Sequence, residues 1–181
     1  MTRAPRYVAL LRGINVTGRN KIPMAELRTV CGELGWRDVA TYIQSGNAIF
    51  SATGVARKLE ADLEKAIEKH FSLTIPVIVR SAAEWPSYVK GNPFPDASVK
   101  EGNLVMLCLS KLPPHKDAVD KLRERAASGE VVERVGDALW IHFAAGVGRS
   151  KLSPAFFDRV AGSPVTARNW RTVLKLAEML S

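Results

Sequence analysis

The sequence predicts an α+β protein made of two tandem ferredoxin-like halves, in which the order strand, helix, strand, strand, helix, strand occurs twice. Two predicted strands that are apolar on both faces, at residues 7–11 and 103–109, each open a series of alternating helical and strand patterns. A segment rich in Gly, Asn and Pro separates the two series. We therefore expect a first half at residues 1–90, a linker at 91–102, and a second half with a closing helix at 103–181.

In the first half, residues 7–11 are apolar throughout and end at Arg12-Gly13, which is typical of a strand buried on both faces. A helix follows, because apolar residues recur at helical spacing before Gly35: Met24, Leu27, Val30, Cys31 and Leu34. The remaining elements are expected at residues 39–44 and 48–50 (a hairpin), 59–70 (a helix), 75–79 (a strand) and 82–89 (a short helix).

The helix at 59–70 is amphipathic, and its charged residues are expected on the outer face: Glu60, Glu64, Lys65 and Glu68. The hairpin turn is Ser45-Gly46-Asn47, whose residue types favour a tight reversal.

In the second half the same order returns. Strands are expected at 103–109, 131–135, 139–143 and 165–168, and helices at 114–127, 151–160 and 170–180. The halves share no obvious residue identity, so the repeat lies in the topology.

The first strand of each half is apolar on both faces, yet the helices of a split βαβ unit cover one face only. Something must therefore cover the second face in both halves. Packing of the two sheets on each other is the simplest arrangement, and homodimerisation through them is the alternative.

Composition bounds the class of protein. The chain has 181 residues, 46% of them hydrophobic, and a formal net charge of +8 that is spread over both halves. Cys31 and Cys108 lie among apolar neighbours, so buried free thiols are expected rather than a disulfide. No secretory signal and no stretch long enough to cross a membrane is recognisable, so we expect a cytoplasmic protein without a membrane partner.

Topology brings loops together at two places. The first and second strands of each half are parallel, so the loop at 12–21 and the turn at 45–47 are expected at one end of the first sheet. Candidate ligand-binding residues there are Arg12, Asn15, Lys21, Ser45 and Asn47. Cations beside the start of a helix favour an anion.

By the same rule, the loop at 146–151 and the segment 166–170 are expected at one end of the second sheet. Candidate ligand-binding residues there are Arg149, Ser150, Lys151, Arg168, Asn169 and Trp170. Asn169 and Ser153 are also candidate helix caps, and the glycines and arginines of both clusters have a purely structural alternative in turns and ion pairs.

No residue pattern assigns a catalytic acid, base or nucleophile, so enzymatic activity stays open. The three histidines lack metal-ligand spacing, and no cofactor motif is present; neither a metal nor a cofactor is expected.

Several strings resemble a bacterial family known as domain of unknown function 1697. They are residues 9–16, 21–24, 41–47 with Phe50, and 77–80, then Asn92-Pro93-Phe94 in the middle and residues 148–152 and 166–172 near the C-terminus. Thr17 departs from the family, which often has a second glycine there. The resemblance implies a two-part α+β protein and no established reaction, and its signatures coincide with the two loop clusters.

Three functions are open. The first is binding of a phosphorylated or otherwise anionic small molecule, such as a nucleotide, at the two loop clusters. The second is a nucleic-acid-binding module that contacts backbone phosphates. The third is a protein-interaction or scaffold role; the oligomeric state is not determined by the sequence.

Overall fold

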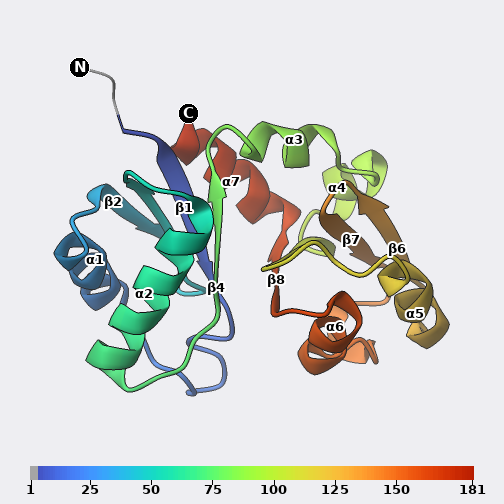
Figure 1. Cartoon of the computed structure of the whole chain (residues 1–181). Coiled ribbons are helices and arrows are strands. Elements are labelled where there is room, and N and C mark those ends of the chain that lie inside the picture. Colours follow the sequence, from blue (N-terminus) through green and yellow to red (C-terminus); the bar gives the residue numbers. More distant parts are fainter. Residues whose placement is uncertain (1–3) are drawn as a thin grey trace. The chain divides into compact units, whose positions relative to one another are not determined.

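The structure, a computed structural model, describes residues 4–181 (Figure 1). Its contacts divide the chain into two compact units. The first contains the chain up to Trp85 together with Leu176–Ser181, and the second contains Pro86–Lys175. Each unit holds one four-stranded antiparallel sheet, which confirms the α+β class with two split βαβ halves.

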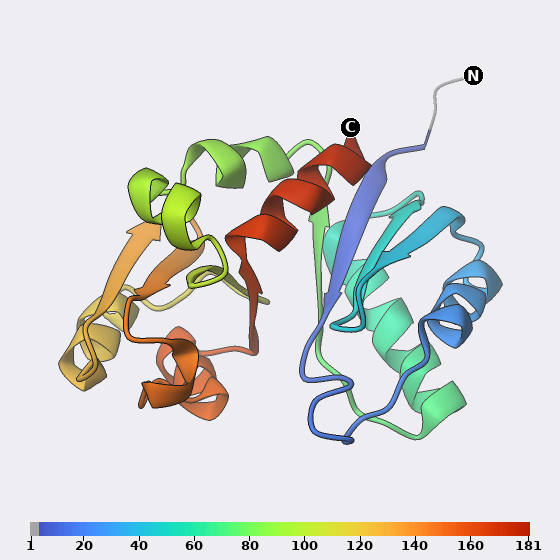
Figure 2. The same cartoon turned by 180° about the vertical axis from the view of Figure 1, so that it is seen from behind.

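The first unit contains the elements β1 Arg6–Leu11, α1 Met24–Glu33, β2 Arg37–Tyr42, β3 Asn47–Ser51, α2 Ala56–Phe71 and β4 Val77–Ser81. Its strand order is β2-β3-β1-β4, with every neighbouring pair antiparallel. Helices α1 and α2 cover one face of this sheet, as the views from both sides show (Figures 1 and 2). Trp36 and Phe50 stack at 3.8 Å between ring centroids in the core beneath these helices.

The second unit repeats this plan. It contains β5 Val105–Ser110, α5 Ala118–Arg125, β6 Glu130–Val135, β7 Ala138–Phe143, α6 Pro154–Ala161 and β8 Val165–Asn169. Its strand order, β6-β7-β5-β8, is equivalent to that of the first sheet. Helices α5 and α6 pack on one face over a core that includes Ile141 and Phe157. A 3₁₀ turn, Val147–Arg149, lies between β7 and α6.

The second face of each sheet is buried, as the doubly apolar strands predicted. In the first sheet Val8 and Leu10 point away from the helix-side core, and they are 0% and 1% exposed. In the second sheet Leu107 and Leu109 are each 1% exposed on the equivalent face. Which surface covers these faces stays a prediction.

The segment expected to be a linker, residues 91–102, contains a helix, α4 Pro95–Glu101, and it follows α3 Trp85–Lys90. Pro95 occupies the first turn of α4, and the Asn92 side chain bonds to both Ser98 Oγ (2.7 Å) and the backbone N–H of Phe94 (2.9 Å). The residues read as turn formers therefore start a helix. The closing helix α7, Trp170–Leu180, lies at the predicted residues.

The helix α2 differs from expectation in the role of its carboxylates. Glu60 is 5% exposed rather than on the outer face, and its Oε1 accepts a hydrogen bond from the backbone N–H of Val79 at 2.9 Å. Glu64 accepts in the same way from Val77 at 2.8 Å. In the second unit, Asp158 of α6 accepts from Val165 of β8 at 2.9 Å. Each carboxylate satisfies an outward donor of an edge strand, which otherwise is a site for unwanted strand pairing.

Within residues 4–181, no helix has both the length and the apolar character needed to cross a membrane.

Candidate functional site

The loop after β1 and the turn between β2 and β3 meet at one end of the first sheet, as the topology predicted. The backbone N–H of Leu11 donates to the carbonyl of Gly46 at 2.8 Å. The side-chain amide of Asn15 donates to the carbonyl of Gln44, also at 2.8 Å. The structure therefore brings Arg12, Asn15 and Lys21 into one region with Ser45 and Asn47. We call residues 12–21 and 43–47 together the β1 loop site.

Asn15 organises this site. Its Nδ2 donates to Ile22 O (3.0 Å) as well as to Gln44 O, and its Oδ1 accepts from the N–H of Ile22 (2.9 Å). Its backbone N–H also donates to Asn20 O at 3.1 Å. Both amide hydrogens and the oxygen are used, so Asn15 fixes the shape of the loop.

The backbone of the site is strained. The backbone φ angle is positive at four residues: 54° at Asn15, 49° at Thr17, 50° at Asn20 and 50° at Ile43. Asparagine tolerates this left-handed region, but the branched side chains of Thr17 and Ile43 do not fit it well. Such residues cost about 1–3 kcal/mol each and gather where the surrounding structure imposes a particular shape, often at functional sites.

Cations occupy the exposed part of the site. Lys21 and Arg19 are exposed. Arg12 is half-buried, and its backbone N–H donates to Pro76 O at 3.0 Å. Lys21 lies two residues before Pro23, the N-cap residue of α1, and no side chain caps this helix. The first N–H groups of α1 thus lack an intrahelical acceptor, and the positive end of the helix dipole lies next to the loop.

Ser45 and Asn47 play structural parts. Asn47 is 0% exposed, and its Nδ2 donates to Tyr42 O (3.0 Å) and Ser45 Oγ (3.1 Å). Between them, Gly46 has φ of 83°, and a Cβ there would lie 2.7 Å from Ile14 Cδ1. The turn is therefore built to bring the hairpin close to the β1 loop.

The second predicted cluster is arranged differently. The Ser150 hydroxyl donates to Glu130, and its oxygen accepts from the N–H of Leu152 at 3.1 Å. Backbone carbonyls of Arg149 and Lys151 accept from Ser128 Oγ (3.1 Å) and Arg125 Nε (3.2 Å). The loop at 146–151 is thus fastened beside α5 and the start of β6, with the side chains of Arg149 and Lys151 exposed.

Arg168 lies on the other face of the second sheet. It pairs with Leu107, which also pairs with Trp140, so these three side chains share the face opposite the α5–α6 core. Its Nη1 donates to Thr166 Oγ1 (2.8 Å) and Ala167 O (2.9 Å), and burial lowers its pKa to about 10. The structure therefore separates Arg168 from the Ser150 hydroxyl rather than joining them.

Asn169 ends β8, and Trp170 is the first residue of α7. The N–H of Thr172 donates to Asn169 Oδ1 at 3.0 Å, which confirms the predicted helix cap. The Trp170 ring lies 5.9 Å from that of Trp140, with an interplanar angle of 56°. The Trp140 Nε1 is buried and has no hydrogen-bond acceptor among the residues that the structure describes.

A relationship missed in the sequence links Arg168 to Arg80. Each arginine is the fourth residue of the last strand of its unit, and each is at most 9% exposed. Each donates from Nη1 to the backbone carbonyl of the residue before it, at 3.0 Å for Arg80 and 2.9 Å for Arg168. The segments 77–80 and 165–168 share only Val at the first position and Arg at the fourth, so the equivalence becomes clear only through strand register.

The two thiols offer no nucleophile. Cys31 and Cys108 are buried and free, as expected, and burial raises the pKa of each to about 12. Among the described residues, no three His, Cys, Asp or Glu side chains gather in a way that could hold a metal ion.

The fold and its loops define a class: a protein of two ferredoxin-like units with a basic, rigid loop at one end of the first sheet. Residues 4–140 match the family described as "Protein of unknown function (DUF1697)", and the chain belongs to that family. The matched range ends before the C-terminal strings at 148–152 and 166–172 that also suggested it.

Among solved structures, five chains match. One is described as conserved bacterial protein SP0830 from Streptococcus pneumoniae; it is 25% identical, with a TM-score of 0.70, and the match covers 98% of this chain and 99% of that one. No curated protein matches the chain. The comparisons thus identify a bacterial family whose function is unknown.

Proposed function

We propose that the protein binds a phosphorylated or otherwise anionic small molecule, such as a nucleotide, at the β1 loop site. One observation carries the proposal: exposed Lys21 and Arg19 lie in a loop held rigid by Asn15, directly before a helix start without a side-chain cap. Cations and free backbone N–H groups in one place favour phosphate or carboxylate oxygens.

Rigidity supports this function. A loop that is already fixed pays little ordering entropy when a ligand binds. Asn15 joins the loop to Gln44 and Ile22, and Asn20 closes it through Nδ2 to Gly13 O at 2.9 Å. The cations are thus presented on a preorganised frame.

The first turn of α1 contains one carboxylate, Glu26. Its Oε2 lies 3.4 Å from Nε2 of His70 on α2. Because this side chain is directed toward α2, it leaves the loop side of the helix start to the cations.

A thermal-shift titration of the full chain with ATP, inorganic phosphate and sulfate tests the proposal. A ligand at 100 times its dissociation constant adds about 2.7 kcal/mol of stability, which raises the melting temperature by several degrees. The double variant Arg19→Gln/Lys21→Gln should show a smaller shift than the wild-type protein, because two of the three cations of the loop are gone.

Arg37→Gln/Arg57→Gln is the matched control, since both residues are exposed in the same unit and away from the loop. It should keep the wild-type shift. Equal shifts in both double variants would refute the β1 loop site. Binding of single-stranded oligonucleotides alone, falling with a logarithmic slope of about −0.7 per phosphate contact as salt rises, would favour the nucleic-acid alternative.

We also propose a cytoplasmic location. Two buried cysteines that stay free are typical of proteins from reducing compartments, and this supports the location.

A further inference from the structure

A groove of about 490 Å³ lies between α5 and α6 in the second unit. Its walls are formed by Lys121, Glu124, Arg125, Phe156, Arg159 and Val160. The volume falls in the range of small-molecule sites, and three of the six side chains are cationic while one is acidic. None of these residues belongs to the β1 loop site.

The two arginines are held by an aromatic ring. The guanidinium carbon of Arg125 lies 4.9 Å from the centroid of Phe156, and that of Arg159 lies 5.1 Å from it. A guanidinium over a ring is restricted in orientation but keeps the N–H groups at its edge for other acceptors. Arg125 uses only Nε, which donates to Lys151 O at 3.2 Å. Its terminal nitrogens remain available to a ligand.

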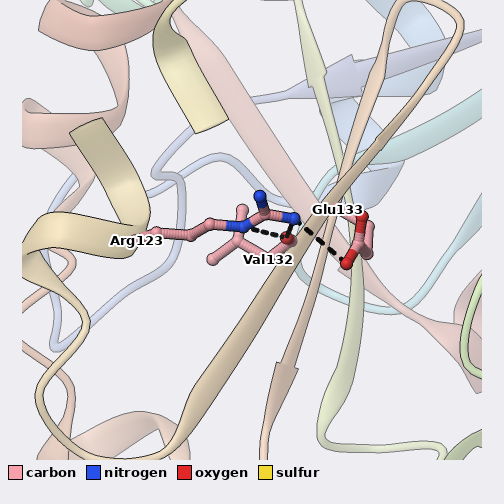
Figure 3. A network of polar contacts seen from close by, with 3 residues as sticks. All are labelled: Arg123, Val132 and Glu133. Carbon is pink, nitrogen blue, oxygen red and sulfur yellow. Dashed lines mark hydrogen bonds and ion pairs between the residues drawn. The ribbon is translucent and has the colours of Figure 1, made fainter. Parts of the chain in front are cut away.

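Charge compensation is uneven around α5. Arg123 has both an acceptor and an ion-pair partner: its Nε and Nη2 donate to Val132 O at 3.1 and 2.9 Å, and Nη2 lies 3.1 Å from Glu133 Oε1 (Figure 3). Lys121 pairs with Asp117 at 2.6 Å. In contrast, neither Arg125 nor Arg159 forms an ion pair with any residue in the described part of the chain.

Two carboxylates of the neighbouring segments, Glu130 and Asp158, accept hydrogen bonds from other residues. Glu130 accepts from Ser150 and from the N–H of Ser128, and Asp158 accepts from the N–H of Val165. Among the described side chains that line the groove with the two arginines, that of Glu124 is the one carboxylate.

The equivalent groove of the first unit provides an internal comparison. It lies between α1 and α2, measures about 460 Å³, and contains Glu33 and Asp62 together with Lys65 and Lys69. Its charges balance, and no aromatic ring lies between two arginines. The arrangement of Arg125, Phe156 and Arg159 is therefore not a general consequence of the repeated fold.

We propose that the α5–α6 groove binds a small ligand with two or more phosphate groups. The forks of Arg125 and Arg159 contact phosphate oxygens, and Lys121 adds a third cation at the rim. The site does not depend on the function proposed for the β1 loop site, since it uses a different unit and different residues.

The test is calorimetric titration of the full chain with pyrophosphate and with ATP, while amide NMR shifts locate the binding. Arg159→Gln should weaken binding to the groove about tenfold or more, the effect of losing a charge-assisted hydrogen-bonding group. Lys116→Gln removes the same charge from an exposed position in the same unit and should change the affinity less than about twofold. Amides of α5 and α6 should shift, whatever happens in residues 12–21.

Three outcomes overturn the proposal. The first is the absence of shifts in α5 and α6 at millimolar pyrophosphate and ATP. The second is equal affinity of Arg159→Gln and Lys116→Gln. The third is a response of these amides to a single-stranded oligonucleotide only, which would assign the groove to a nucleic-acid backbone. Failure of the β1 loop site alone would appear as loss of shifts at residues 12–21, with those of α5 and α6 retained.

Discussion

The side-chain amide of Asn15 donates a hydrogen bond of 2.8 Å to the backbone carbonyl of Gln44, and this bond joins the β1 loop to the β2–β3 turn. The same side chain makes two further bonds to the backbone of Ile22. Asn15 therefore holds three segments in place: the loop, the turn and the entry to α1.

Asn15→Gly should lower the free energy of unfolding by about 1–3 kcal/mol, because three hydrogen bonds are lost while glycine still accepts the φ of 54°. Thr17→Gly is the matched control. It also lies at positive φ but bonds only to the adjacent carbonyl of Val16, so relief of strain should leave it neutral or slightly stabilised. Urea denaturation measures both, and equal effects would contradict the role given to the Asn15 side chain.

Gly46→Ala should destabilise the protein more than Gly18→Ala. Both glycines have positive φ, 83° and 78°, so each alanine costs about 1–2 kcal/mol in backbone strain. At Gly46 the new Cβ would also meet Ile14 Cδ1 at 2.7 Å and Leu11 Cβ at 2.8 Å, whereas nothing lies within 4 Å at Gly18. Overpacking should add about 1–3 kcal/mol. Equal melting temperatures for the two variants would show that the turn and the β1 loop are not closely packed.

Glu60→Ala should lower stability by about 1–3 kcal/mol, because the N–H of Val79 loses its acceptor in a buried position. Glu68→Ala, on the exposed face of the same helix, should change the free energy of unfolding by less than about 0.5 kcal/mol. Chemical denaturation of both variants separates the two cases. A neutral Glu60→Ala would mean that the edge strand β4 does not need this carboxylate.

Cys31 and Cys108 should not react with a thiol reagent in the native protein at about pH 8, and both should react in denaturant, because buried protonated thiols are inert. Burial raises their pKa from 9.0 to about 12. Between pH 9.0 and about pH 12 the unfolded chain loses thiol protons that the folded chain keeps. This contribution to stability is therefore present below pH 9.0 and lost as the pH rises toward 12. Rapid labelling of one native thiol would contradict the burial.

The sequence predicted the order of strands and helices well, because the first strands are uninterrupted apolar runs and the helices have clear periodicity. It missed α4 and predicted a linker there, since Asn92, Pro93 and Pro95 are both turn formers and helix starters. Only the bonds from Asn92 to Ser98 and Phe94 decide between these roles. Periodicity also put Glu60 on the outer face, because a carboxylate that serves an edge strand cannot be recognised without the strand beside it.

The first loop cluster was predictable because parallel strands end at the same edge of a sheet. The second was not, since Arg168 and the loop of Ser150 share an end of the sheet but lie on opposite faces, which is decided by strand register. The groove at Phe156 was missed as well, because Arg125 and Arg159 come from helices that are brought together only by the tertiary fold.

The central claim is that the β1 loop site binds a phosphorylated small molecule. Its most direct test is an amide NMR titration of the full chain with ATP. The account predicts saturable shifts at residues 12–21 and 43–47 and at the start of α1, and their loss in Arg19→Gln/Lys21→Gln. A folded wild-type protein whose loop amides do not move at millimolar ATP would contradict it.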